Sequence, residues 1–236
     1  MVKYPVRMED DARFLRIIGW LLFAITVGAF VQSYFIPVSR GEFASANVWM
    51  HPHAIVSFAF AALFIAQPWL VLKRSWRWHR VLGWVMGVLV LGAVVTGVAV
   101  QFGMWPTVPE DVQNRIPAAF RLFQLLPTLF LFFVAGILAR KRPDWHWRLM
   151  LHAAYAPVGT AVGRFVRLIP DPPFGGSGPF LSFILLLGII GILASDKVRY
   201  GRVHLANWLG LAFYILTIPL SLFIANTGWY TRISLG

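Results

Sequence analysis

Seven long apolar runs limit what this chain can fold into more than any other feature of its sequence. Each is about 16 to 26 residues long, and short polar segments separate them. A helix needs about 20 apolar residues to cross a bilayer, and it satisfies its own backbone hydrogen bonds there. The sequence therefore predicts an all-α, polytopic transmembrane helix bundle of about seven spans. The expected spans are residues 14–37, 48–72, 79–104, 117–139, 145–164, 179–194 and 204–226.

The composition supports one integral membrane domain over residues 1–236, with residues 1–13 as a cytoplasmic or interfacial segment. Only 13% of the residues are charged and 58% are hydrophobic, whereas soluble domains average about 25% charged residues. The formal net charge of +12 resembles that of a nucleic-acid-binding protein. The basic residues, however, cluster in the short loops between apolar runs, as in membrane proteins. We therefore expect the lipid bilayer as the partner, other membrane subunits as further candidates, and no nucleic acid.

The basic residues also predict an orientation. Loops 73–80, 140–148 and 197–202 hold four, four and three Lys or Arg residues, whereas the alternate loops hold fewer, beside Asp or Glu. Loops rich in Lys and Arg stay in the cytoplasm. We expect a bacterial inner-membrane protein with a cytoplasmic N-terminus and an external C-terminus.

Two of the basic loops have similar sequences. Lys73-Arg74-x5-Arg80 and Lys141-Arg142-x5-Arg148 align without a gap, and each has His and Trp beside its last Arg. Duplicated helix pairs are a common origin of membrane bundles, although two short basic loops also converge by composition alone.

His152 is the main candidate for binding a cofactor, because it lies in an apolar stretch well past the basic loop. At helical spacing it shares one stripe with Ala156, Gly159 and Gly163. Small residues beside a histidine leave room for a flat ring system such as haem or a quinone. The same pattern also lets two helices approach closely.

A haem b site needs two imidazoles on different helices, with cations for the propionates. His152 with His79 or His204 meets this requirement, and Gly83 adds space one turn after His79. Arg80 and Arg148 are the expected propionate partners. The alternative for His79, His146 and His204 is an interfacial position at a helix start.

His51 and His53 form a weaker candidate site for copper or zinc on the outer side. Residues at i and i+2 do not share a helix face, so both bind one metal only if Pro52 opens the helix there. Otherwise one imidazole turns inward and the other lies at the interface. The absence of cysteine excludes disulfides, thiolate metal sites, iron–sulfur clusters and c-type haem.

No HExxH, P-loop or GxSxG motif appears, and the last run has no lysine for a retinal. All nine acidic residues are expected in loops or in the N-terminal segment. This pattern argues against an ion-coupled pump. Pro157 and Pro219 each lack a backbone N–H, so we expect bends or openings in both helices.

A few motifs together resemble a known family. They are a histidine early in the second helix, Arg77-x-His-Arg-x-x-Gly83, Asp144-x-His-x-Arg-x-Met150, and Arg164 at the end of the fifth helix. They resemble a family of bacterial multi-pass membrane proteins defined only as a domain of unknown function, over about residues 50–170. The resemblance implies a membrane fold and no established activity. The chain departs from the pattern at His152, where the family is expected to have Arg.

The sequence contains no complete catalytic constellation. The preferred interpretation is a membrane redox protein associated with haem b or a quinone, or a subunit of a membrane redox complex. The alternatives are a non-catalytic accessory subunit and a protein that binds a lipid or small molecule.

Overall fold

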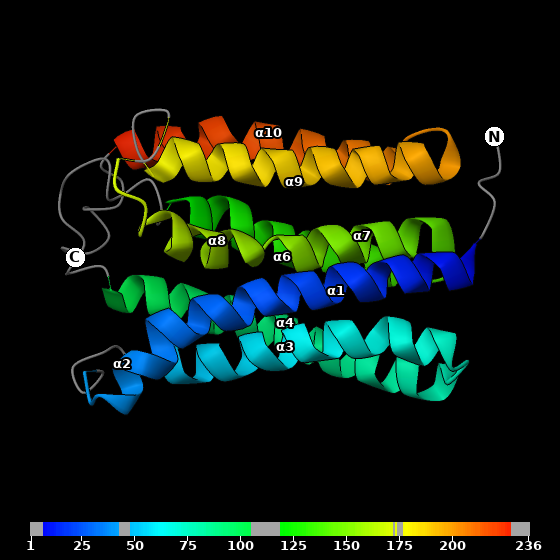
Figure 1. The fold of residues 1–236 in the computed structure, drawn as a ribbon, viewed down its shortest axis with the longest axis horizontal. Coiled ribbons are helices and arrows are strands. Elements are labelled where there is room, and N and C mark those ends of the chain that lie inside the picture. The colour runs from blue at the N-terminus through cyan, green and yellow to red at the C-terminus, as the bar shows by residue number, and fades with distance from the viewer. Residues whose placement is uncertain (1–6, 43–47, 105–118, 172, 174–176, 228–236) are drawn as a thin grey trace.

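The computed structural model describes residues 7–42, 48–104, 119–171, 173 and 177–227. Long helices run side by side along one axis and form a bundle (Figure 1). In chain order the elements are α1 (Met8–Phe30), η1 (Val31–Phe35), α2 (Ile36–Ser39), α3 (Met50–Leu72), α4 (Trp76–Met104), η3 (Arg121–Leu125), α6 (Leu126–Leu138), α7 (Pro143–Tyr155), α8 (Val158–Val166), α9 (Ser177–Tyr200) and α10 (Leu205–Asn226).

Six stretches of this bundle are long and apolar enough to cross a membrane: 8–39, 50–72, 76–103, 121–138, 180–200 and 205–226. α7 and α8 together form a further, interrupted passage. The outer surface is apolar: Trp84, Val88, Leu91 and Val95, spaced four or three apart on α4, are all more than half exposed. Such a stripe suits contact with lipid. The predicted all-α polytopic bundle is confirmed, and the chain is an integral membrane protein.

The three basic loops gather at one end of the bundle, which we call the basic end. Turns 73–75, 139–142 and 201–204 and the start of α1 all lie there, at the right in Figure 1. Arg74 (φ 54°) and Gly201 (φ 73°) adopt left-handed backbone conformations that reverse the chain directly after α3 and α9. Such short turns join antiparallel neighbours, so three helix hairpins open toward the other end.

The two prolines expected to disturb helices behave differently. α7 ends at Tyr155 and α8 begins at Val158, so the opening expected near Pro157 is confirmed. α10 runs without interruption from Leu205 to Asn226 through Pro219, so the opening expected there does not occur. The two π-helical segments, η1 and η3, each end two residues before a proline (Pro37 and Pro127), where the normal ladder cannot continue.

Two segments are longer than predicted. α1 begins at Met8 rather than near residue 14, and α9 covers 24 residues rather than about 16. In both cases the helix continues through charged residues that hydropathy assigns to a loop. Among them, Asp11, Asp196 and Arg199 find partners inside the bundle, as described below.

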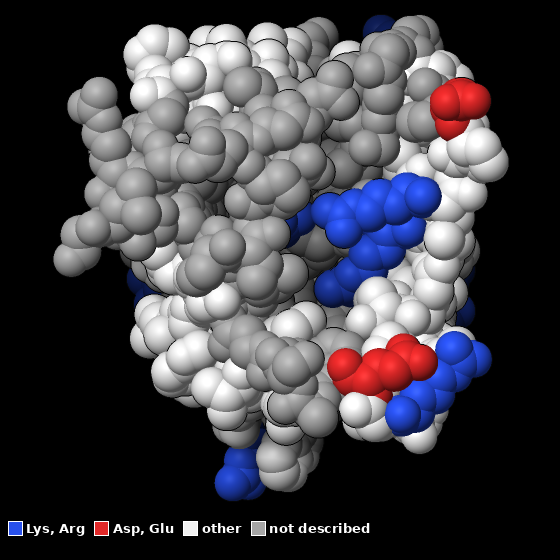
Figure 2. Space-filling view, turned by 90° about the vertical axis from the view of Figure 1, so that its left-hand side faces the viewer, with Lys and Arg blue, Asp and Glu red and all other residues white. Residues whose placement is uncertain are grey.

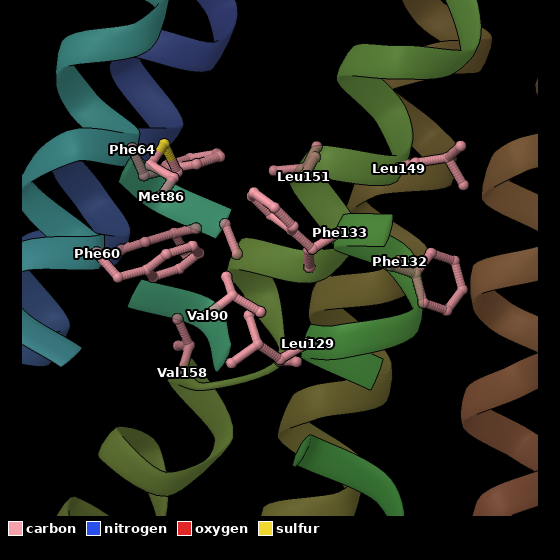
Figure 3. Close-up of a cluster of buried hydrophobic side chains, with 14 of the residues drawn as sticks. Phe60, Phe64, Met86, Val90, Leu129, Phe132, Phe133, Leu149, Leu151 and Val158 are labelled. Atoms are coloured by element: carbon pink, nitrogen blue, oxygen red, sulfur yellow. The ribbon is translucent and has the colours of Figure 1, made fainter. Parts of the chain in front are cut away.

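The core lies where the α3–α4 hairpin meets α6, α7 and α8. Phe60 and Phe64 of α3 and Met86 of α4 face Leu129 and Phe133 of α6 (Figure 3). Phe132, Leu149, Leu151, Val90 and Val158 extend the same cluster. Aromatic rings dominate this interface, which holds the two halves of the bundle together.

Candidate functional site

A buried ion pair joins α7 to α9 at the basic end. Arg148 donates to Asp196 through Nε (3.0 and 3.1 Å to the two carboxylate oxygens) and through NH2 (2.5 Å), and its NH1 donates to the Asp144 main-chain oxygen (2.6 Å). The side chains are 1% and 0% exposed. The guanidinium also lies over the Trp147 and Tyr200 rings, 4.1 and 4.8 Å from their centroids. Both charges are thus compensated within the protein.

A second ionic contact ties α1 to α9. Asp11 of α1 accepts hydrogen bonds from Arg199 and from the Tyr200 hydroxyl. The Arg199 guanidinium lies over the Phe14 ring, 4.4 Å from its centroid. The N-terminal helix is thereby fixed to the end of α9.

His204 links the same cluster to α10. Its Nδ1 accepts the N–H of Ala206 (3.1 Å) as the helix cap, so its proton lies on Nε2, which donates to Asp144 Oδ2 (3.2 Å). The main-chain N–H of His204 donates to Asp196 Oδ2 (2.7 Å). Burial and then the Arg148 charge lower the pKa of His204 below 6.5, although Asp144 opposes this shift. The ring therefore acts as a neutral cap and crosslink.

These contacts correct two sequence-based expectations. Asp144 and Asp196 lie in helices rather than in loops, and Asp196 is fully buried. Arg148, expected to hold a haem propionate, is instead paired with Asp196. Sequence separation hides this pair, because its partners stand 48 residues apart.

His152, the predicted cofactor ligand, packs against α10. Its Nε2 lies 3.1 Å from Asn207 Oδ1, and its ring centroid lies 5.3 Å from that of Phe132. A Cβ atom at Gly210 would fall inside van der Waals contact with the ring, so the glycine makes room for it. His152 is 3% exposed and lines neither of the cavities described below. Its contacts are those of a helix–helix crosslink.

The small-residue stripe after His152 also packs helices. A Cβ at Gly159 would meet Leu125 and Leu185 at 3.0 and 3.1 Å, and one at Gly163 would meet Leu181 at 3.1 Å. These leucines come from η3 and α9. Of the two interpretations of this stripe, the structure favours close helix approach.

A cavity of about 430 Å³ opens at the basic end, and we call it the basic-end cavity. Its walls come from α1, α3, α4, α6 and α7. Phe64, Met86 and Phe133, seen in Figure 3, lie along it. Of the predicted site residues, His79, Arg80 and Gly83 line this cavity. Its other aromatic and polar members include Trp76, Trp84, Gln67, Arg140, His146 and Trp147.

His79 of α4 and His146 of α7 meet across this cavity. Their ring centroids lie 6.3 Å apart with an interplanar angle of 78°. His146 Nδ1 donates to the Gly136 carbonyl (2.8 Å). In the orientation where both the nitrogen and the oxygen of its side-chain amide make hydrogen bonds, Gln67 donates to His79 Nδ1 (2.5 Å) and accepts from the Gly83 N–H (3.1 Å). The sequence placed His146 at a helix start and did not predict this pairing. The similarity between the two basic loops was the only sequence signal for it.

His51 and His53 do not converge. α3 already begins at Met50, so Pro52 does not open the helix. His51 is exposed and bonds Tyr34 (2.6 Å), whereas His53 turns inward to Thr96 (3.0 Å). Within the described residues no group of three or more His, Cys, Asp or Glu is placed to hold a metal ion.

Comparisons with known proteins return nothing: no family model, curated protein or solved structure matches the chain. The resemblance carried by the Arg77–Gly83 and Asp144–Met150 motifs stays a prediction.

Proposed function

We propose that this protein binds a lipid-soluble quinone in the basic-end cavity, against the paired imidazoles of His79 and His146. The pairing of these two rings carries the proposal. They come from different helices, face one cavity, and each has its Nδ1 held by another residue. We expect Nε2 of each ring to be the atom that binds the ligand. Partners at Nδ1 fix a ring and its tautomer, as in sites where imidazoles bind a ligand.

The proton positions favour a quinone over haem b. Because Gln67 donates to His79 Nδ1, the His79 proton lies on Nε2, which is a donor. Because His146 donates through Nδ1, its Nε2 is an acceptor. One donor and one acceptor match a quinone carbonyl and the hydroxyl of its reduced form. A bis-histidine haem needs two unprotonated nitrogens, which would require the Gln67 contact to change.

The walls of the cavity suit the rest of such a ligand. Trp76, Trp84 and Met86 offer flat or adaptable apolar surfaces for a ring and an isoprenoid tail. Arg80 and Arg140 line the same cavity and remain exposed, which places its mouth at head-group depth. The ligand thus reaches the imidazoles from the bilayer.

We further propose that the protein is a subunit of a membrane redox complex in the bacterial inner membrane, with the basic end in the cytoplasm. The support is the gathering of the three basic loops at one end, which the insertion bias holds inside. A periplasm-dependent reporter fused at Ser75 should be inactive. An active reporter there would contradict this orientation.

Binding can be measured by titrating decylubiquinone into the protein in nanodiscs, with empty nanodiscs subtracted. Each of His79→Leu and His146→Leu should weaken binding about tenfold, because each removes one hydrogen bond to the ligand. The matched control is His51→Leu, which changes an imidazole outside the cavity and should leave affinity unchanged.

Two results would overturn the proposal. A haem band in the reduced-minus-oxidised spectrum that His79→Leu abolishes would assign the site to haem. No quinone binding by the wild type, with no such band, would favour the accessory-subunit alternative.

A further inference from the structure

A second cavity, of about 100 Å³, lies in the opposite half of the bundle, and we call it the opposite-end cavity. Most of its lining is apolar, including Leu22, Phe30, Phe60 and Leu129. Phe64 is the one described residue that lines both cavities. An engineered cavity of about 150 Å³ holds benzene, so this one suits a molecule of about four to six heavy atoms.

Two arginines face into this apolar space. Arg164, on the last turn of α8, and Arg121, at the start of η3, both line the cavity, and no Asp or Glu stands among its described lining residues. Seen from this end, a group of basic side chains lies near the middle of the face (Figure 2). The cavity is therefore positive.

Arg164 is incompletely satisfied by the protein. Its NH1 atom is buried and has no hydrogen-bond partner. Its guanidinium lies over the Phe30 ring, 4.6 Å from the centroid, which fixes its plane but supplies no acceptor. Arg164 is half-buried, and a buried guanidinium nitrogen without an acceptor is costly at membrane depth and indicates a functional site.

The neighbouring polar groups do not supply that acceptor. Arg121 Nε donates to Gln101 Oε1 (2.8 Å). The Thr96 hydroxyl donates to the Gly92 carbonyl (2.6 Å), so His53 Nδ1 must be the donor in its 3.0 Å contact with Thr96. The His53 ring is therefore held in place by Thr96. The positive charge of the cavity comes from the two guanidinium groups.

We propose that the opposite-end cavity binds a small carboxylate with a short apolar chain. A planar guanidinium pairs with a carboxylate through two parallel hydrogen bonds, which gives the buried Arg164 NH1 its acceptor. The apolar walls then cover the chain of the ligand. A free inorganic anion would gain the charge contact without using these walls.

The test uses butyrate, with three probes that each lack one feature: butanol lacks the charge, butylammonium reverses it and inorganic phosphate lacks the chain. Titration calorimetry on the purified protein should show binding of butyrate alone. Arg164→Gln should weaken it about tenfold or more, because a hydrogen bond to a charged group is lost. Arg167→Gln, a change at the exposed arginine three residues on, should retain it.

Stability separates binding from folding. The unfolding temperature of Arg164→Gln without ligand should equal or exceed that of the wild type, because a half-buried positive charge without a hydrogen-bond acceptor at NH1 is removed. Arg164→Lys keeps a charge but loses the planar fork, so it should weaken binding severalfold, and it serves as the test if the glutamine variant does not fold. Quinone binding should not change in these variants, because only Phe64 is common to the two cavities.

Equal binding of butanol or phosphate would overturn the proposal. So would unchanged butyrate affinity in Arg164→Gln or, where that variant does not fold, in Arg164→Lys.

Discussion

The two ends of the bundle treat buried charge in opposite ways. At the basic end Arg148 contacts Asp196, Arg199 contacts Asp11, and His204 contacts Asp144. At the other end Arg164 faces a cavity whose described lining contains no carboxylate. A cation that has its own carboxylate holds helices together. One that lacks it is placed to meet an anion from outside the chain.

The largest expected effect comes from breaking the compensation at the basic end. Asp196→Asn removes the carboxylate charge while keeping an oxygen for the His204 N–H. It should destabilise the protein by about 3–5 kcal/mol, because Arg148 is left charged and buried. Unfolding in mixed detergent micelles measures this loss. Adding Arg148→Met should recover most of it, whereas a loss below about 1 kcal/mol would mean that this end does not depend on the pair.

The next effect tests whether His152 packs helices together rather than binding a ligand. Gly210→Ala places a methyl group against the imidazole and should cost about 1–3 kcal/mol through overpacking. His152→Ala in the same chain should relieve the strain. The matched control is Gly191→Ala, where nothing lies within 4 Å of the new atom. Equal stability of the Gly210 and Gly191 variants would contradict the packing role.

A smaller effect is the pH response of the His204 crosslink. Burial lowers the pKa of His204 below 6.5, so the unfolded chain binds its proton first as pH falls. The stability that the neutral ring contributes is therefore present above pH 6.5 and is lost as pH falls below it. His204→Asn keeps a capping side chain and should flatten this part of the stability curve. A curve unchanged by that substitution would show that His204 does not titrate there.

The smallest expected effect comes from an exposed ion pair. Arg74 and Glu9 form an ion pair at the basic end, but their side chains are 78% and 58% exposed. Glu9→Gln should change stability by about 0–1 kcal/mol, and less at high salt. A loss as large as that of Asp196→Asn would show that burial is not what separates strong from weak pairs in this protein.

Hydropathy and loop charge were enough to predict the helix bundle, because the length of an apolar run and the charges that flank it are local properties of the sequence. They could not predict which charges lie inside. Asp196 stands one residue before Lys197 and three before Arg199, in a run whose charge predicts a loop, and only α7 packed alongside supplies Arg148. His79 and His146 were both noted at helix starts, but their meeting depends on how two hairpins pack. The cavity beside Arg164 likewise depends on how α8 packs after the break at Pro157, which the sequence does not show.

The Arg148–Asp196 pair also constrains the order in which the chain is built into the bilayer. The two residues are 48 positions apart, so at about 5–20 residues per second Arg148 is synthesised roughly 2–10 s before its partner. During that interval the guanidinium has its contacts within α7, the Asp144 carbonyl and the Trp147 ring, but no carboxylate from α9. α7 can therefore settle at its final depth only after α9 has been synthesised. The α9–α10 hairpin thus completes the insertion of the α6–α7 hairpin.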